Sequence, residues 1–203
     1  MPALRDYVLA GCASQDALEV TGGQLRVDAH VDRAASMPTT LRIGGSSKPE
    51  LRQALHQHHV GLNKAADTLF DDPRFATPGR WTEIRIAAVS VSDLGFMNGA
   101  TYNQVIARAH DVGLAECPLD TAPHLRIAFR NQPEGSIGTA PTPHQAPPGS
   151  ITVASAPLDD RDETPKGFYL RCVEGTLWLR GYWSWSGHVW TPHDVLVFSR
   201  GSI

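Results

Sequence analysis

The chain of 203 residues has a net charge of −3, 41% hydrophobic residues and an isoelectric point near 6.3. It has no basic stretch, and therefore lacks the electrostatic footprint of a surface for duplex DNA or anionic membranes. Its three cysteines lie far apart in the sequence, which excludes a disulfide framework and a CxxC metal site and favours a reducing compartment. No apolar run approaches the roughly 20 residues of a membrane-spanning helix. We therefore expect a soluble cytoplasmic protein without a membrane partner.

The first part of the chain predicts helices and short strands. Segments 24–28 and 40–43 are typical of short strands. From Lys48 to Phe70 the apolar spacing predicts two helices joined by a short turn, which form a helical hairpin. The segment 75–80, FATPGR, interrupts the pattern with proline and glycine and predicts a boundary. The expected organisation is therefore an N-terminal region, 1–80, and a C-terminal domain, 81–203.

The C-terminal domain begins with a central strand and a helix. The nearly continuous apolar run 84–91 is typical of a strand that is buried on both faces. Thr101 and Gln104 have the spacing of a capping box, and Gly113 suits the left-handed residue that ends a helix. We therefore predict an amphipathic helix between residues 101 and 113.

The rest of this domain is expected to be mostly sheet. Leu125 to Arg130 alternates apolar and polar residues and predicts a strand with two arginines on one face. Segment 131–149, which holds five prolines and three glycines, predicts a long loop. Four further strands are expected, of which the last three should form an antiparallel meander, at 151–154, 168–173, 176–185 and 195–198. The predicted fold class is α+β: an N-terminal helical hairpin with short strands, then a mostly antiparallel sheet packed with one amphipathic helix.

Residues from about 84 to 200 resemble a widespread group of uncharacterised bacterial proteins. The resemblance is carried by LGF…GATY, ARAHDVGLAECPL, PHLRIAFRNQPEG and a terminal W-TPHDVLVFSR. It implies a bacterial protein and brings no established activity. Members are sometimes labelled helicases, but this chain lacks the GxxxxGK[ST] loop that cradles phosphates. They usually carry an acidic residue where this chain has Asn131.

Three groups of residues were considered for catalysis or metal binding. His56 and His59 are one helical turn apart but lack the further ligands that zinc requires. The acidic run 159–163 lacks the spacing of a calcium loop and is interpreted as a solvated turn. Cys117 has two histidines nearby in the sequence and is interpreted as a buried apolar residue. We therefore expect no metal and no cofactor, and identify no catalytic residue.

A candidate binding site combines basic, polar and aromatic side chains of the predicted sheet. Trp178, Arg180 and Tyr182 share one face of a strand, where the aromatic rings either pack against other residues or line a ligand groove. The site is predicted on the residues Arg126, Gln132, Glu134, Trp178, Arg180 and Tyr182.

Three functions remain open. We favour a non-enzymatic binding or regulatory protein that recognises a protein or peptide partner, because the sequence shows an Arg/aromatic surface and no catalytic signature. The alternative is a small toxin-like hydrolase or transferase that uses an unfamiliar His/Glu/Arg site. The third, a nucleic-acid-binding module, is disfavoured because the second helix of the hairpin offers only Asn63 and Lys64 for contacts.

Overall fold

The structure is a computed structural model that describes residues 36–135 and 146–200, and the expected strand at 24–28 lies outside this part. The predicted α+β class is confirmed. The elements in chain order are β1 (Thr40–Ile43), α1 (Lys48–Gln57), β2 (Gly61–Leu62), α2 (Lys64–Asp71), β3 (Thr82–Ser90), β4 (Ala100–Thr101), α3 (Tyr102–Asp111), β5 (Leu114–Ala115), α4 (Thr121–Ala128), β6 (Ile151–Val153), β7 (Gly167–Val173), β8 (Thr176–Tyr182), β9 (Val189–Trp190) and β10 (Val195–Arg200).

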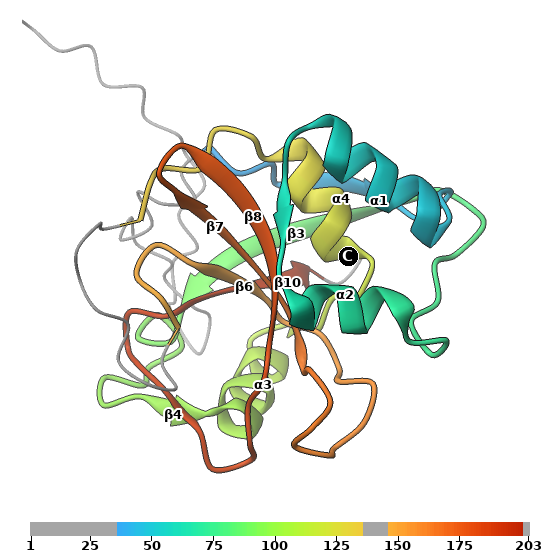
Figure 1. Cartoon of the computed structure of the whole chain (residues 1–203). Helices are drawn as coiled ribbons and strands as arrows, with labels where there is room; N and C mark the ends of the chain where they lie inside the picture. The colour runs from blue at the N-terminus through green and yellow to red at the C-terminus, as the bar shows by residue number, and fades with distance from the viewer. Residues whose placement is uncertain (1–35, 136–145, 201–203) are drawn as a thin grey trace, which may run out of the picture.

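A single large sheet forms the centre of the molecule (Figure 1). Its strand order is β1-β3-β10-β6-β7-β8-β2, and β5 pairs with one end of β10. The β10–β6 and β2–β8 pairs are parallel, and the other pairs of the sheet are antiparallel. A separate antiparallel pair, β4 with β9, lies beside it.

The sheet separates two hydrophobic cores, because successive residues of its central strands point to opposite faces. In β10, Val195 and Val197 join the core under α1, α2 and α4, whereas Leu196 and Phe198 join the core under α3. Figure 1 shows α1, α2 and α4 on one side of the sheet and α3 on the other. Burial on both faces explains why β3 and β10 have nearly continuous apolar sequences.

The helix starts follow the predicted local chemistry. Thr101 N–H donates to Gln104 Oε1 at 2.9 Å, so the capping box at the start of α3 is present. Gly113 has a φ of +80° where α3 ends, as expected for a left-handed C-terminal residue. Asn63 caps α2 and also joins it to the sheet, because its side chain bonds the backbone N–H and C=O of Gly181.

The strand predicted at Leu125–Arg130 is wrong, because these residues belong mainly to the helix α4. Leu125 and Phe129 alternate as in a strand, but they are also four residues apart, and with Ala122 they form a buried helical stripe. Pro123 is tolerated since it lies in the first turn, where N–H groups have no intrahelical partner. Packing of α4 on α1, β1 and the sheet decided between the two patterns.

The predicted antiparallel meander is correct for β7 and β8 and wrong for the last strand. β7 and β8 form a hairpin over the turn at Glu174 and Gly175, both with positive φ. β10 lies between β3 and β6, antiparallel to the first and parallel to the second. Both faces of β10 carry apolar side chains that must be buried, and a position at the centre of the sheet buries both.

The described part of the N-terminal region shares a core with the C-terminal domain. β1 pairs with β3, β2 pairs with β8, and the core under α1 and α2 includes residues of β6, β7, β8 and β10. Segment 75–80 is therefore a loop beside this common core. Within the described residues no helix is long and apolar enough to cross a membrane.

Candidate functional site

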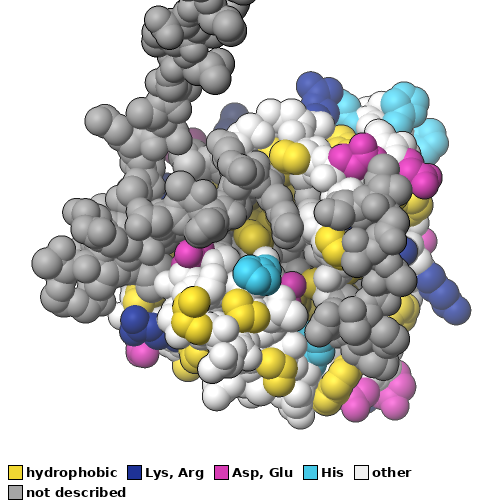
Figure 2. Space-filling model, turned by 90° about the vertical axis from the view of Figure 1, so that its left-hand side faces the viewer, with side chains coloured by type: hydrophobic (Ala, Val, Ile, Leu, Met, Phe, Trp, Pro, Cys, Tyr) yellow, Lys and Arg dark blue, Asp and Glu magenta, His cyan; other side chains and the backbone are white. Residues whose placement is uncertain are grey.

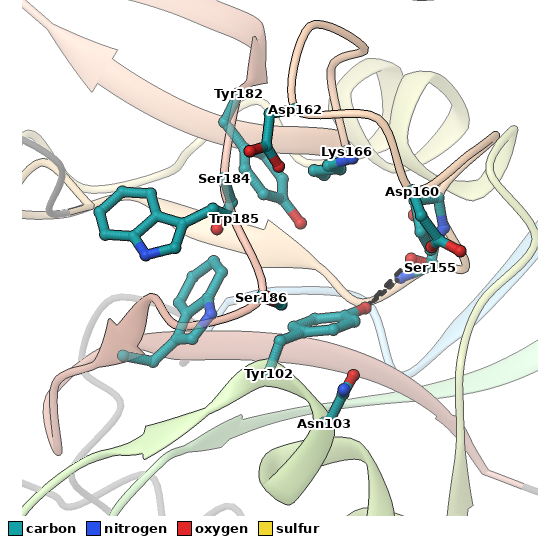
Figure 3. Close-up of a pocket in the computed structure, with 12 residues that line it drawn as sticks. Tyr102, Asn103, Ser155, Asp160, Asp162, Lys166, Tyr182, Ser184, Trp185 and Ser186 are labelled. Carbon is teal, nitrogen blue, oxygen red and sulfur yellow. Dashed lines mark hydrogen bonds between the residues drawn. The ribbon is translucent and has the colours of Figure 1, made fainter.

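A cavity lies on the α3 side of the sheet, at one end of β8. It has a volume of about 400 Å³, in the range of small-ligand pockets. Its walls are the first residues of α3, the loop 155–166 after β6, and the segment 183–190 after β8 (Figure 3). A neighbouring cavity of about 260 Å³ shares Tyr182, Ser184 and Trp190 with it. We call the larger one the aromatic cavity.

Aromatic rings form much of its wall. The rings of Tyr182 and Trp190 meet edge to face with centroids 5.9 Å apart, and Tyr102 lies 6.1 Å from Trp190. At the mouth, Trp185 contacts His188 and remains 45% exposed. On the face shown in Figure 2, exposed hydrophobic side chains form separate yellow patches among polar groups and backbone.

Hydrogen bonds fix Tyr102 at the inner end of the cavity. Its hydroxyl accepts from Ser155 N–H at 3.1 Å and lies within donating distance of Glu116 Oε1, at 3.1 Å, and Ser155 O, at 3.0 Å. Burial raises the pKa of Tyr102 far above its ordinary range, and burial likewise raises the pKa of Tyr182. Both phenols are therefore protonated donors, and neither can act as a general base near neutral pH.

Three other polar groups of the cavity wall make no hydrogen bond within the described structure. Ser155 Oγ and Trp190 Nε1 are buried without a partner, although their residues are only 2% and 3% exposed. The Tyr182 hydroxyl points into the cavity in Figure 3 and also has no bond there. Buried polar groups are normally paired. Of the three, the Tyr182 hydroxyl is the one directed at the cavity, where it offers a ligand a position that can donate or accept, whereas Ser155 Oγ and Trp190 Nε1 are closed off from solvent.

The acidic loop at the other side of the mouth contains one carboxylate that is paired with arginines and two that are not. Asp159 accepts from Arg74 at 2.6 Å and from Arg161 at 2.8 Å, and these bonds hold the pKa of Asp159 well below its usual value. Asp160 and Asp162 line the cavity and have neither a hydrogen bond nor an ion pair within the described chain.

Two further bonds hold this loop in place. Lys166 Nζ donates to the backbone carbonyls of Asp159 and Arg161. Trp183 Nε1 donates to Glu163 O at 3.1 Å, which ties the aromatic segment to the acidic loop. The mouth of the cavity is thus built by two loops that support each other.

Arg126 and Gln132, two of the predicted site residues, are buried on the opposite side of the sheet. Arg126 is 0% exposed and donates to Gln132 Oε1, and the Gln132 amide donates to Gly149 O and Leu170 O. Arg126 Nε and Nη2 have no partner among the described residues, and desolvation lowers the pKa of this guanidinium to about 10. The buried pair joins α4 to the start of the proline-rich loop and to β7.

The other predicted residues are distributed over the hairpin. Glu134 accepts from Gly175 N–H at 3.1 Å. Trp178, Arg180 and Tyr182 do share one face of β8, and Arg180 lies over the Trp178 ring at 5.4 Å. That face is opposite to the one under α4, so the structure does not bring Arg126 together with the aromatic side chains. Of the six, Tyr182 alone lines the aromatic cavity.

The residues considered for catalysis are placed in structural roles. Burial raises the pKa of Cys117 to about 12 and also raises that of Cys172, so neither is an activated thiolate. His124 and Asp120 both accept from Gly44 N–H at 3.1 Å and thereby attach the β1–α1 turn to α4. In the described part of the chain no three His, Cys, Asp or Glu side chains come together as metal ligands would.

Most of the cavity residues were missed by sequence reasoning. Tyr102 and Ser155 were not singled out, and Asp160 and Asp162 were assigned to a solvated turn. The tryptophans after residue 177 were the one local signal, and the structure leaves Trp183 and Trp185 half-exposed beside the cavity. Only the fold brings these segments to one place.

Comparison of the chain with protein families, curated proteins and solved structures found no match. The site is therefore defined by its own geometry, as a concave, aromatic and partly acidic cavity.

Proposed function

We propose that this chain is a non-enzymatic binding protein that holds a segment of a protein or peptide partner in the aromatic cavity. The observation that carries this proposal is an aromatic wall around a cavity of small-ligand size, into which the Tyr182 hydroxyl points. A phenolic hydroxyl both donates and accepts, so it can pair with an acceptor or a donor of a ligand.

A peptide segment meets this requirement. Its backbone supplies carbonyl acceptors and N–H donors at short intervals, and its apolar atoms can lie on the rings of Tyr102 and Trp185. The half-exposed Trp183 and Trp185 extend the aromatic surface beyond the mouth, where a partner longer than the cavity would continue. Tryptophan is one of the residues enriched at the hot spots of protein interfaces.

The chemistry of the wall favours binding over catalysis. The two phenols are protonated, and the two cysteines of the described residues, Cys117 and Cys172, are buried outside this cavity. Asp160 and Asp162 lie at the mouth without a hydrogen-bonded base or nucleophile among the described residues. A hydrolase or transferase would place a nucleophile within hydrogen-bond reach of its base.

The test is a selection from a random-sequence peptide library with the purified full chain. We expect enrichment of related sequences by the unsubstituted protein and loss of that enrichment with Trp185→Ala. Trp81→Ala is the matched control, because Trp81 is similarly exposed but contacts His124 on the other side of the sheet. No enrichment, or equal enrichment with Trp185→Ala, would contradict the proposal.

A further inference from the structure

We propose that the partner group recognised by the aromatic cavity is a basic side chain, lysine or arginine, whose charge lies beside Asp160 or Asp162. This inference rests on the proposed function and adds the chemical class of the ligand. It starts from the contrast between carboxylates of one short loop: Asp159 is bonded to two arginines, whereas Asp160 and Asp162 face the cavity without a cation bonded to them.

The nearby positive charges are bonded within the loop. Lys166 also lines the cavity, and its ammonium is bonded to two backbone carbonyls of the same loop, at 2.6 Å and 3.2 Å, whereas Arg161 is bonded to Asp159. On the inner side, Glu116 adds a further carboxylate next to the Tyr102 hydroxyl. The mouth therefore carries an excess of negative charge, which attracts cationic ligands.

The wall also suits the rest of such a residue. The aliphatic stem of lysine or arginine can lie along the rings of Tyr102 and Trp185 while its charged end stays in water beside the carboxylates. Aromatic faces attract cations in addition. The backbone carbonyl of the same residue can accept from the Tyr182 hydroxyl, which points into the cavity.

Other ligand classes fit less well. A neutral polyol could pair with the Tyr182 hydroxyl, but it would leave the two carboxylates uncompensated. An anionic group would be repelled by Asp160 and Asp162. A basic peptide residue can pair with the hydroxyl and also supply the opposite charge.

The experiment uses three blocked tripeptides that differ only in the central residue: acetyl-Gly-Lys-Gly-amide, its norleucine analogue and its glutamate analogue. Binding to the full chain is followed by titration with NMR detection of the tryptophan side chains. We expect the lysine peptide to bind about tenfold more tightly than the norleucine peptide, as for one charge-assisted hydrogen bond. The glutamate peptide should bind most weakly.

The combined variant Asp160→Asn/Asp162→Asn should reduce the preference for lysine over norleucine to about onefold. Glu163→Gln is the matched control, since Glu163 is an exposed carboxylate of the same loop that does not line the cavity, and it should leave the preference unchanged. Asp160 and Asp162 are exposed and unpaired, so thermal unfolding of the combined variant should match that of the unsubstituted chain.

The possible failures are distinguishable. Equal binding of the lysine and norleucine peptides that is lost with Trp185→Ala would overturn the cationic ligand and leave the peptide-binding cavity in place. Saturable binding of maltose, with none of any tripeptide, would replace the peptide by a polyol and overturn both proposals. No saturable binding of any peptide would also overturn both.

Discussion

Two polar regions on opposite faces of the sheet differ in what surrounds them. On the face under α4, the guanidinium of Arg126 is enclosed, bonded to Gln132 and completely buried. On the face under α3, Ser155, Trp190 and Tyr182 are also partly or fully buried, but these residues line a cavity with an open mouth, into which the Tyr182 hydroxyl points. Both regions contain polar atoms without partners.

The difference shows that an unpartnered buried group indicates a ligand only where there is room for one. Arg126 lies among packed residues of α4, β7 and the start of the proline-rich loop, so its substitution should change stability. The cavity groups lie on a wall that a ligand can reach, so their substitution should change binding. Substitutions on the two faces can therefore separate the two roles.

The largest effect is expected from Arg126→Ala. Truncation leaves a cavity and removes the donor to Gln132, and together these should lower the free energy of unfolding by about 4 kcal/mol. Arg126→Met keeps most of the volume and removes an imperfectly paired charge, and should cost no more than about 2 kcal/mol. Urea unfolding measures both. A loss below about 1 kcal/mol for Arg126→Ala would contradict a structural role.

Two glycine substitutions compare the packing of the two faces. A Cβ at Gly181 would come within 2.6 Å of the Ala65 carbonyl carbon, so Gly181→Ala must displace α2 and should cost about 2–3 kcal/mol. A Cβ at Gly167 would meet Ser155 Oγ at 3.2 Å and the Tyr182 hydroxyl at 3.4 Å. Gly167→Ala should therefore cost less than about 1 kcal/mol.

Peptide binding is the second measurement for the two glycine variants, Gly181→Ala and Gly167→Ala. Gly167→Ala should weaken binding of the lysine tripeptide, because its methyl group would touch two side chains of the cavity wall. Similar unfolding free energies for the two variants would mean that α2 packs on β8 less closely than the structure describes.

A smaller effect is expected from pH at the enclosed face. Burial lowers the pKa of His124 below its ordinary value of 6.5, so the unfolded chain binds this proton more readily. The contribution of His124 to the free energy of unfolding should therefore fall as the pH drops below about 6.5. The contribution of Asp120 to stability changes with pH in the opposite direction. Burial raises the pKa of its carboxyl, so this contribution grows as the pH falls toward 4.

His124→Gln tests this contribution. Glutamine keeps an acceptor for Gly44 N–H and does not titrate, so the decrease in stability between pH 7 and pH 5 should become shallower, as measured by denaturant unfolding at several pH values. An unchanged slope would assign the pH dependence to other groups.

The smallest effect on stability is expected at Tyr182. Its hydroxyl makes no hydrogen bond within the described structure, so Tyr182→Phe should change the free energy of unfolding by less than about 0.5 kcal/mol. Binding of the lysine tripeptide should nevertheless weaken by about fivefold, as for one neutral hydrogen bond. Thermal unfolding and titration measure the two effects. Unchanged binding would place the ligand away from this hydroxyl.

Several elements could be predicted from sequence because their signals are local. The capping box of Thr101 and Gln104 and the left-handed Gly113 define α3 through contacts between near neighbours. The apolar run of β3 indicates burial on both faces. The α+β class and the β7–β8 hairpin follow from patterns of the same kind.

Other features depend on contacts between residues far apart in the chain. The sequence from Leu125 to Phe129 fits a strand and a helix equally, and packing of α4 on α1, β1 and the sheet selected the helix. The position of β10 between β3 and β6 likewise follows from the need to cover both of its apolar faces, which hairpin spacing alone does not reveal.

The candidate site was decided by tertiary structure almost entirely. Tyr182 was identified from its strand, but Tyr102, Ser155 and Asp160 reach the same cavity from separate segments. By itself the sequence determined the fold class, the amphipathic helix α3 and the aromatic character of the segment after β8. Which polar groups became enclosed and which lined a cavity depended on long-range packing, because burial is a property of the assembled sheet and helices.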